Sequence, residues 1–205
     1  MAKAVRRQLF AYETTLSICY MHSPTECKTY YRGVYDAEYC PAFAMEQGGD
    51  GLFVAVGGGG TLATSPDARA WTDRNVYDSE TGDIVAFGTG AYTSVAFGNN
   101  KIVTFNSSGR PVVNSTSAAT TFTQYQRLPN TAAGTNFNIK VAFGNGYFVA
   151  VGRTGLTSPN DIGTWVSTDG ISWTFSQQLG ATGLTPVSID YVGGRFYVQM
   201  SDGIS

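Results

Sequence analysis

The stretch Val141–Gly152, VAFGNGYFVAVG, consists of two short apolar runs around the pair Asn145-Gly146. An Asn-Gly pair between apolar runs is a strong β-hairpin signal, because both turn residues must adopt φ > 0. In the second run, residues 147–152, apolar side chains alternate onto both faces of the expected strand. A strand with two apolar faces must be covered on both, as happens when sheets stack on one another.

A second decisive stretch follows at Ser167–Thr174, STDGISWT. Asp169 is suited to accept hydrogen bonds from N–H groups of its own turn, and Gly170 supplies a positive φ. Trp173 then opens the next strand, and we expect its large ring to be buried. The stretch therefore predicts a turn that ends one strand and starts another.

Both stretches recur along the chain, which indicates a repeat architecture. The same hydrophobic position returns at Phe53, Ile102, Phe148 and Phe196, a period of about 46–49 residues. Repeats of this length with four short antiparallel strands are typical of propeller blades. We therefore predict an all-β propeller with repeats at residues 40–91, 92–137, 138–185 and, in part, 186–205. Residues 1–39 are expected to form either a degraded first repeat or an irregular attachment arm.

The composition is that of a folded, weakly charged protein: 42% of residues are hydrophobic, 14% are charged, and the formal net charge is −2. Basic residues cluster only at Lys3, Arg6 and Arg7, so a groove that tracks phosphates has little support and no nucleic-acid partner is expected. No run of 18 apolar residues occurs, and we expect no membrane insertion. The N-terminus lacks the apolar region of a signal peptide, so none is expected.

Residues that bind metals or cofactors are sparse. His22 is the single histidine, and it precedes an expected turn at Ser23-Pro24. Cys19, Cys27 and Cys40 lack C-x-x-C spacing and are expected to be free thiols. Gly57–Gly60 is not followed by the Lys-Ser/Thr pair of a phosphate loop, which favours a hairpin turn. We expect neither a cofactor nor a metal site.

The hairpin phrase and the Ser-x-Asp-Gly-x-x-Trp phrase together resemble the sialidase-like propeller repeats that carry Asp-boxes, of the kind found in bacteriophage tail and fibre proteins. The resemblance covers residues 40–205 well and residues 8–30 loosely. In that family the Asp-box is a structural turn at the blade periphery, away from the mouth where ligands bind. The resemblance implies a scaffolding role for the matching positions, which are Ser65, Asp67, Trp71, Ser115, Phe122, Ser167, Asp169 and Trp173.

Two copies depart from this pattern. The second has Ser117 at the acidic position and Phe122 at the aromatic one, so we expect a weaker turn held by hydroxyl hydrogen bonds. The fourth is expected to start the same turn at Ser201–Ser205, one residue short of the tryptophan. Two explanations are open: the natural chain continues, or a neighbouring subunit supplies the closing strand.

Sialidases with this scaffold use an arginine triad, a tyrosine nucleophile and a carboxylate, as the resemblance implies. None of the arginines lies in a repeat context that marks three of them as convergent. The acidic residues, among them Asp67, Asp73, Asp78 and Asp169, fall almost wholly in expected turns. A glycosidase needs two carboxylates at a defined separation. We therefore expect no enzymatic activity and no catalytic residue.

These features predict a non-enzymatic structural component of a virus particle, namely a bacteriophage tail, fibre or head-decoration protein. It is expected in the virion, assembled in the host cytoplasm, with other virion proteins, copies of itself and a host surface glycan as partners. The first alternative is a carbohydrate-binding propeller in which exposed Tyr92, Tyr125 or Tyr147 stack on sugar rings. The second alternative, ranked last, is a sialidase-like glycoside hydrolase.

Overall fold

The structure is a computed structural model that describes residues 44–47, 52–67, 69–86, 90–114, 120–132, 137–156, 161–179 and 184–201. For residues 44–47 only the backbone is considered. The described residues form strands and one short 3₁₀ turn, without an α-helix among them, so the predicted all-β class is confirmed. The predictions for residues 1–39, the three cysteines, His22, Ser115 and Ser117 lie outside the described residues.

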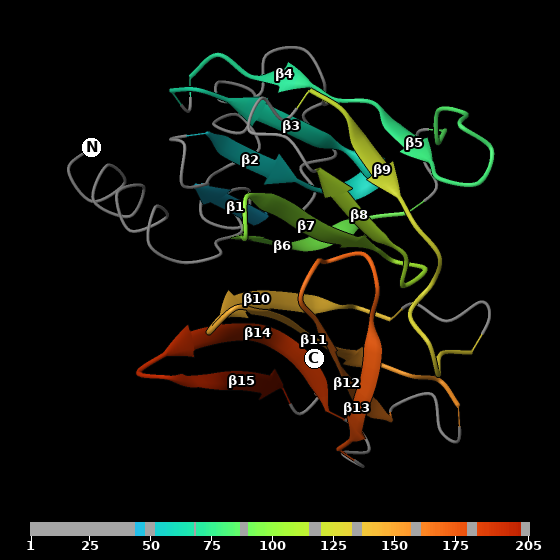
Figure 1. Ribbon diagram of the computed structural model, residues 1–205, viewed down its shortest axis with the longest axis vertical. Helices are drawn as coiled ribbons and strands as arrows, with labels where there is room; N and C mark the ends of the chain where they lie inside the picture. The colour runs from blue at the N-terminus through green and yellow to red at the C-terminus, as the bar shows by residue number, and fades with distance from the viewer. Residues whose placement is uncertain are drawn as a thin grey trace.

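The strands form four sheets that follow one another along the chain (Figure 1). Sheet 1 contains β1 (Ala44–Gln47), β2 (Phe53–Val56), β3 (Leu62–Ser65) and β4 (Thr72–Asp73). Sheet 2 contains β5 (Val76–Asp78), β6 (Tyr92–Gly98), β7 (Lys101–Asn106), β8 (Pro111–Asn114) and β9 (Phe122–Gln124). Sheet 3 contains β10 (Lys140–Gly144), β11 (Tyr147–Arg153), β12 (Ile162–Ser167) and β13 (Thr174–Gln178), and sheet 4 contains β14 (Thr185–Val192) and β15 (Arg195–Ser201).

Sheets 1 and 3 have the expected four antiparallel strands, but sheet 2 differs. After β4 the chain crosses to the outer edge of sheet 2, where β5 pairs in parallel with β9 through Val76 and Phe122. Val76 is buried in the apolar layer between sheets 1 and 2, which explains why this segment leaves its own sheet. The fifth strand therefore ties the first two sheets together.

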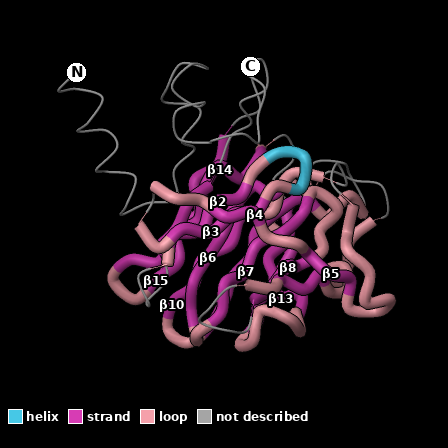
Figure 2. The backbone as a smooth tube through the Cα atoms, turned by 90° about the horizontal axis from the view of Figure 1, so that it is seen from above, coloured by secondary structure: helices cyan, strands magenta, loops and turns pink. Residues whose placement is uncertain are grey.

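Consecutive sheets stack through one edge strand each: β6 of sheet 2 contacts β1 and β10, and β10 contacts β14 (Figures 1 and 2). Hydrogen bonds reinforce the contact between β6 and β10. The Ser94 hydroxyl donates to the Val141 carbonyl at 3.3 Å and accepts from the Val141 N–H at 3.1 Å. Lys140 Nζ donates to the Thr93 carbonyl at 3.0 Å. The stacking order of the sheets is that of successive propeller blades.

The predicted hairpin at Asn145-Gly146 is confirmed: it joins β10 to β11, and φ is 50° and 80° at the two residues. The same geometry recurs between β6 and β7 at Asn99-Asn100 and between β14 and β15 at Gly193-Gly194. Two positive φ angles define the hairpin turn that matches strand twist. Gly57–Gly60 also joins two antiparallel strands, β2 and β3, through the short 3₁₀ turn at Gly58–Gly60.

A glycine in the repeated phrase Ala-Phe-Gly lets the sheets approach closely. A Cβ added at Gly98 would lie 2.1 Å from the Phe143 ring, and one at Gly144 would lie 2.1 Å from the Tyr191 ring. Each glycine therefore receives an aromatic ring from the next sheet. This contact explains why the phrase recurs at the period of the repeat.

Apolar layers fill the spaces between neighbouring sheets. The layer between sheets 1 and 2 includes Val54, Val56, Tyr92 and Phe122; the layer between sheets 2 and 3 includes Val103, Phe105, Phe148 and Trp165; and the layer between sheets 3 and 4 includes Val151, Ile162 and Ile189. Trp165 is the largest side chain with no exposed surface. The core thus lies between sheets rather than at one centre.

Candidate functional site

The turn at Ser167–Trp173 is built on its aspartate, as the residue types predict. Asp169 Oδ1 accepts the backbone N–H groups of Ile171 and Ser172, both at 2.8 Å, and the Ser167 hydroxyl at 2.9 Å. Gly170 has φ 72°. Trp173 Nε1 closes the turn by donating to the Gly170 carbonyl at 2.9 Å.

The turn at Ser65–Trp71 repeats this pattern. Asp67 Oδ1 accepts the N–H groups of Arg69 at 2.8 Å and Ala70 at 2.9 Å, and the Ser65 hydroxyl at 3.0 Å. In the second copy, Phe122 is fully buried at the start of β9. The family role that the resemblance implies for these positions stays a prediction.

The Ser167–Trp173 turn packs against sheet 2. Lys101 Nζ donates to the Asp169 carbonyl at 2.9 Å, and a Cβ at Gly170 would lie 2.4 Å from Val103. The Trp173 ring packs edge-on against Phe105, with centroids 5.1 Å apart. The Trp173 ring is only partly buried, whereas the sequence predicted a buried ring. The difference arises because the turn lies at the edge of the contact between the sheets, where one side of the ring remains exposed to solvent.

Turn contacts lower the pKa of both aspartates. The N–H groups of Ala70 and Arg69 hold the pKa of Asp67 below 3.8. Partial burial acts to raise the pKa of Asp169, but the N–H groups of Ser172 and Ile171 outweigh it, and the net pKa is also below 3.8. These contacts therefore favour the ionised carboxylates.

We expect this stabilisation to disappear in acid. A lowered folded-state pKa adds stability above the unfolded value of 3.8, and that stability is lost as pH falls through the folded pKa. Urea unfolding between neutral pH and pH about 2 is the measurement. Asp169→Asn should be less stable at neutral pH and show a smaller loss in acid, whereas Asp83→Asn serves as control. Equal acid slopes in the wild type and Asp169→Asn would contradict the prediction.

The expected turn at Ser201–Ser205 starts at a different place in its sheet from the other two turns. Ser201 ends β15, the second strand of its sheet, whereas Ser65 and Ser167 end the third strands β3 and β12. Residues 202–205 lie outside the described part of the chain. The turn itself therefore stays a prediction.

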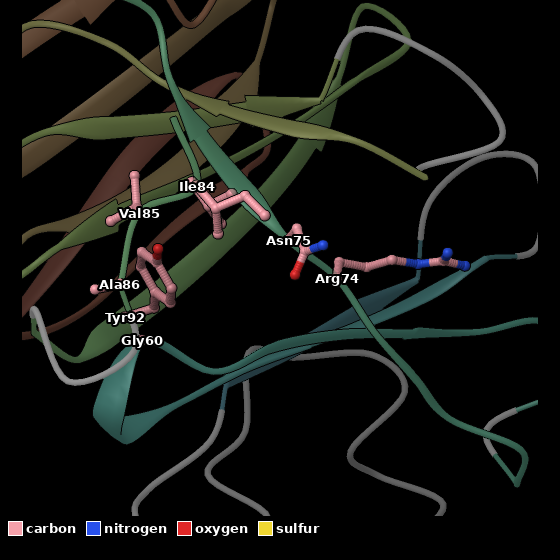
Figure 3. A pocket seen from close by; sticks show the side chains of 8 residues that line it. Gly60, Arg74, Asn75, Ile84, Val85, Ala86 and Tyr92 are labelled. Carbon is pink, nitrogen blue, oxygen red and sulfur yellow. The ribbon is translucent and has the colours of Figure 1, made fainter. Parts of the chain in front are cut away.

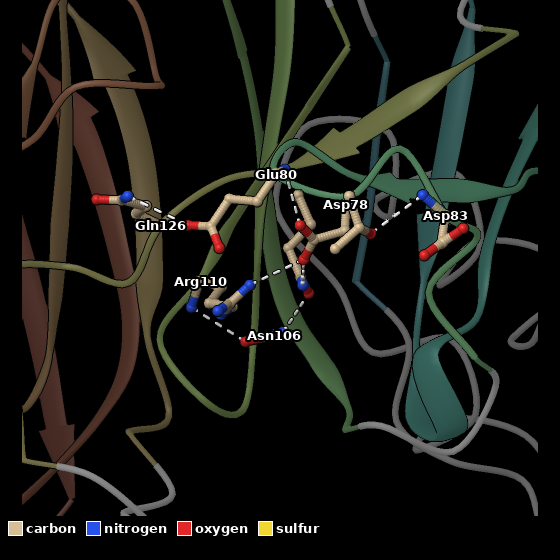
Figure 4. Close-up of polar contacts among 8 residues, drawn as sticks. Asp78, Glu80, Asp83, Asn106, Arg110 and Gln126 are labelled. Atoms are coloured by element: carbon tan, nitrogen blue, oxygen red, sulfur yellow. Dashed lines mark hydrogen bonds and ion pairs between the residues drawn. The ribbon is translucent and has the colours of Figure 1, made fainter.

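A polar network joins the ends of β5, β7 and β9 (Figure 4). Arg110 Nη1 pairs with Asp78 Oδ2 at 3.0 Å, Gln124 Nε2 donates to the same oxygen at 3.3 Å, and Asn106 Nδ2 donates to Gln124 Oε1 at 2.7 Å. The Glu80 N–H is the largest cause of the lowered pKa of Asp78. The network fastens the parallel strand β5, and sequence reasoning missed it because the side chains that pair in it lie 18, 32 and 46 residues apart.

The three candidate sugar-stacking tyrosines differ in exposure. Tyr92 is 3% exposed, and burial raises its pKa to about 12, so its expected exposure is wrong. Tyr125 is partly buried against the layer between sheets 2 and 3. Tyr147, beside the β10–β11 turn, is 45% exposed. Only Tyr147 of the three offers a free ring.

A small pocket lies beside Tyr92, between the 3₁₀ turn and the segment before β6 (Figure 3). Arg74, Asn75, Ile84 and Val85 are among its lining residues. Its volume is about 10 Å³, which is room for one water molecule at most. The pocket is too small for a sugar ring.

The described arginines at the sheet ends have separate partners. Arg74 Nε donates to Thr64 Oγ1 at 2.8 Å, Arg127 Nη1 to the Ala132 carbonyl at 3.4 Å, and Arg153 Nη2 to Thr185 Oγ1 at 2.8 Å.

Within the described ranges, no three His, Cys, Asp or Glu side chains gather as metal ligands. No helix among these residues is long and apolar enough to span a membrane.

No family model and no curated protein matches the sequence. Solved structures do match. YCF48 from Cyanidioschyzon merolae is 16% identical over 80% of this chain and 49% of that chain, with a TM-score of 0.51. A Trypanosoma rangeli sialidase mutant displaying trans-sialidase activity is 13% identical over 85% of this chain and 32% of that chain, with a TM-score of 0.52. YCF48 bound to D1 peptide is 11% identical over 82% and 49%, with a TM-score of 0.45.

The chain spans about half the length of the YCF48 structures and about a third of the sialidase structure. At these identities the likeness shows the sialidase-like propeller fold alone.

Proposed function

We propose that the chain is a non-enzymatic structural component of a bacteriophage particle, a tail, fibre or head-decoration protein whose stacked sheets form a scaffold for assembly. One observation carries the non-enzymatic part: Asp67, Asp78 and Asp169 are committed to contacts within the fold that lower their pKa. A glycosidase acid needs a raised pKa. Partial desolvation raises the pKa of Asp73 on β4, although the residue is exposed at the surface, which makes Asp73 the residue to vary in an activity test.

The particle assignment is supported by the resemblance of the repeated phrases to those of phage tail and fibre proteins. Mass spectrometry of gradient-purified particles from the source is the test. We expect this chain at a stoichiometric level, with other virion proteins as its partners. Detection in the soluble fraction alone would overturn the assignment.

Activity is tested separately. The substrates are sialosides and other glycosides that carry a fluorescent aryl leaving group. We expect the purified wild-type chain to release no more fluorophore from them than the Asp73→Asn variant does. Turnover that Asp73→Asn abolishes, with the variant still folded, would contradict the non-enzymatic role.

A second candidate function is recognition of a host surface glycan, and the exposed ring of Tyr147 favours it. An aromatic ring offers a flat apolar surface on which the C–H face of a sugar ring can pack. On a glycan array, Tyr147→Ala should lose any signal that the wild type gives. Leu156→Ala, a change at another exposed apolar residue, should keep it.

A further inference from the structure

The outer face of sheet 4 is the side of β14 and β15 that points away from sheet 3. The strand register pairs Asp190 with Tyr197 and Val192 with Arg195. Alternation along each strand places these four residues on the side opposite to Ile189, which packs in the layer between sheets 3 and 4. We call these four residues the outer face.

In sheets 2 and 3 the corresponding side receives the next sheet along the chain. By repeat position, Tyr197 corresponds to Val103 and Val149, which pack between sheets. Tyr197 instead is 57% exposed, and Val192 is 62% exposed. Two of the seven large hydrophobic side chains exposed among the described residues, Val192 and Tyr197, therefore lie together on the outer face. Exposed apolar side chains that gather on one face indicate an interaction surface.

The outer face differs in two residues from the faces that receive a following sheet. At the position of Val192, the earlier sheets have Gly98 and Gly144, each of which receives an aromatic ring. A valine side chain fills the space that the ring would need. Asp190 replaces the apolar Ala142, and a stacked apolar sheet would strip water from its carboxylate.

We infer that the outer face binds the same face of a second copy of this chain about a two-fold axis. The face carries one acid, Asp190, and one base, Arg195, so two copies in opposite orientation place each charge against its complement. The inference rests on the proposed function in that it takes assembly as the chain's role.

Sedimentation velocity of the purified chain over a concentration series tests the inference. We expect a monomer–dimer equilibrium with a dissociation constant on the order of 10 µM, as a small interface allows. Tyr197→Lys should weaken the dimer by about tenfold or more. Leu179→Lys changes another exposed apolar residue, outside the face, and should leave the constant unchanged. Circular dichroism and thermal melting confirm that each variant is folded.

Charge exchange gives a second arm. Asp190→Arg and Arg195→Asp should each weaken self-association by about tenfold, because like charges then meet. An equal mixture of the two variants should form a heterodimer as tight as the wild-type dimer. A monomeric wild type, a Tyr197→Lys variant that dimerises normally, or a mixture that does not associate would overturn the inference. If the chain is present in particles but sedimentation shows a monomer, this inference alone is overturned. If the chain forms the dimer but is absent from particles, the proposed function alone is overturned.

Discussion

Replacing Trp165 with alanine is expected to lower the free energy of unfolding by about 3–5 kcal/mol. The ring has no exposed surface and packs edge-on against Phe175, with centroids 5.7 Å apart. Its Nε1 donates to the Pro129 carbonyl at 2.7 Å. Alanine would leave a cavity between sheets 2 and 3 and a carbonyl without its donor. Urea unfolding followed by circular dichroism measures the change.

Trp173→Ala is the matched control. That ring is partly buried and bonds within its own turn, so its loss should cost about 1–3 kcal/mol. Trp165→Phe should fall between wild type and Trp165→Ala, because it keeps an aromatic ring and loses the N–H donor. A larger loss for Trp173→Ala than for Trp165→Ala would show that the assigned burial of the two rings is wrong.

Gly144→Ala is expected to cost about 2–3 kcal/mol through overpacking. The new Cβ would lie 2.1 Å from the Tyr191 ring. Gly144 lies on β10 and Tyr191 on β14, so relieving this clash would require the two strands to move apart and open the layer between sheets 3 and 4. The same unfolding experiment measures the loss. Gly98→Ala, which meets Phe143 at the same distance, should behave alike.

Two variants separate the clash from the simple loss of a glycine. In a Tyr191→Ala background, Gly144→Ala should cost much less, because the ring it meets is gone. In Gly146→Ala the new Cβ would lie in open space, and the positive φ at this position is the only source of strain. We therefore expect this variant to lower the free energy of unfolding by about 1 kcal/mol. Additive losses in the Tyr191→Ala background would rule out the proposed ring contact.

The sequence predicted the strand-rich class, the repeat period and the hairpin at Asn145-Gly146, since alternation and turn residues act over a few neighbours. It also predicted the contacts of Asp169, which joins groups within its own turn. It misjudged Trp173 and Tyr92, because the exposure of a ring depends on which sheet stacks over it.

Local sequence thus accounts for the strands, the turns and their recurrence, because each depends on residues close together in the chain. Stacking between sheets accounts for the rest: the parallel strand β5, the network around Asp78 and the burial of Trp165. The bonds that set this stacking join residues 46 to 69 positions apart. At such separations, the local sequence pattern of one strand does not predict which strand of another sheet it will contact.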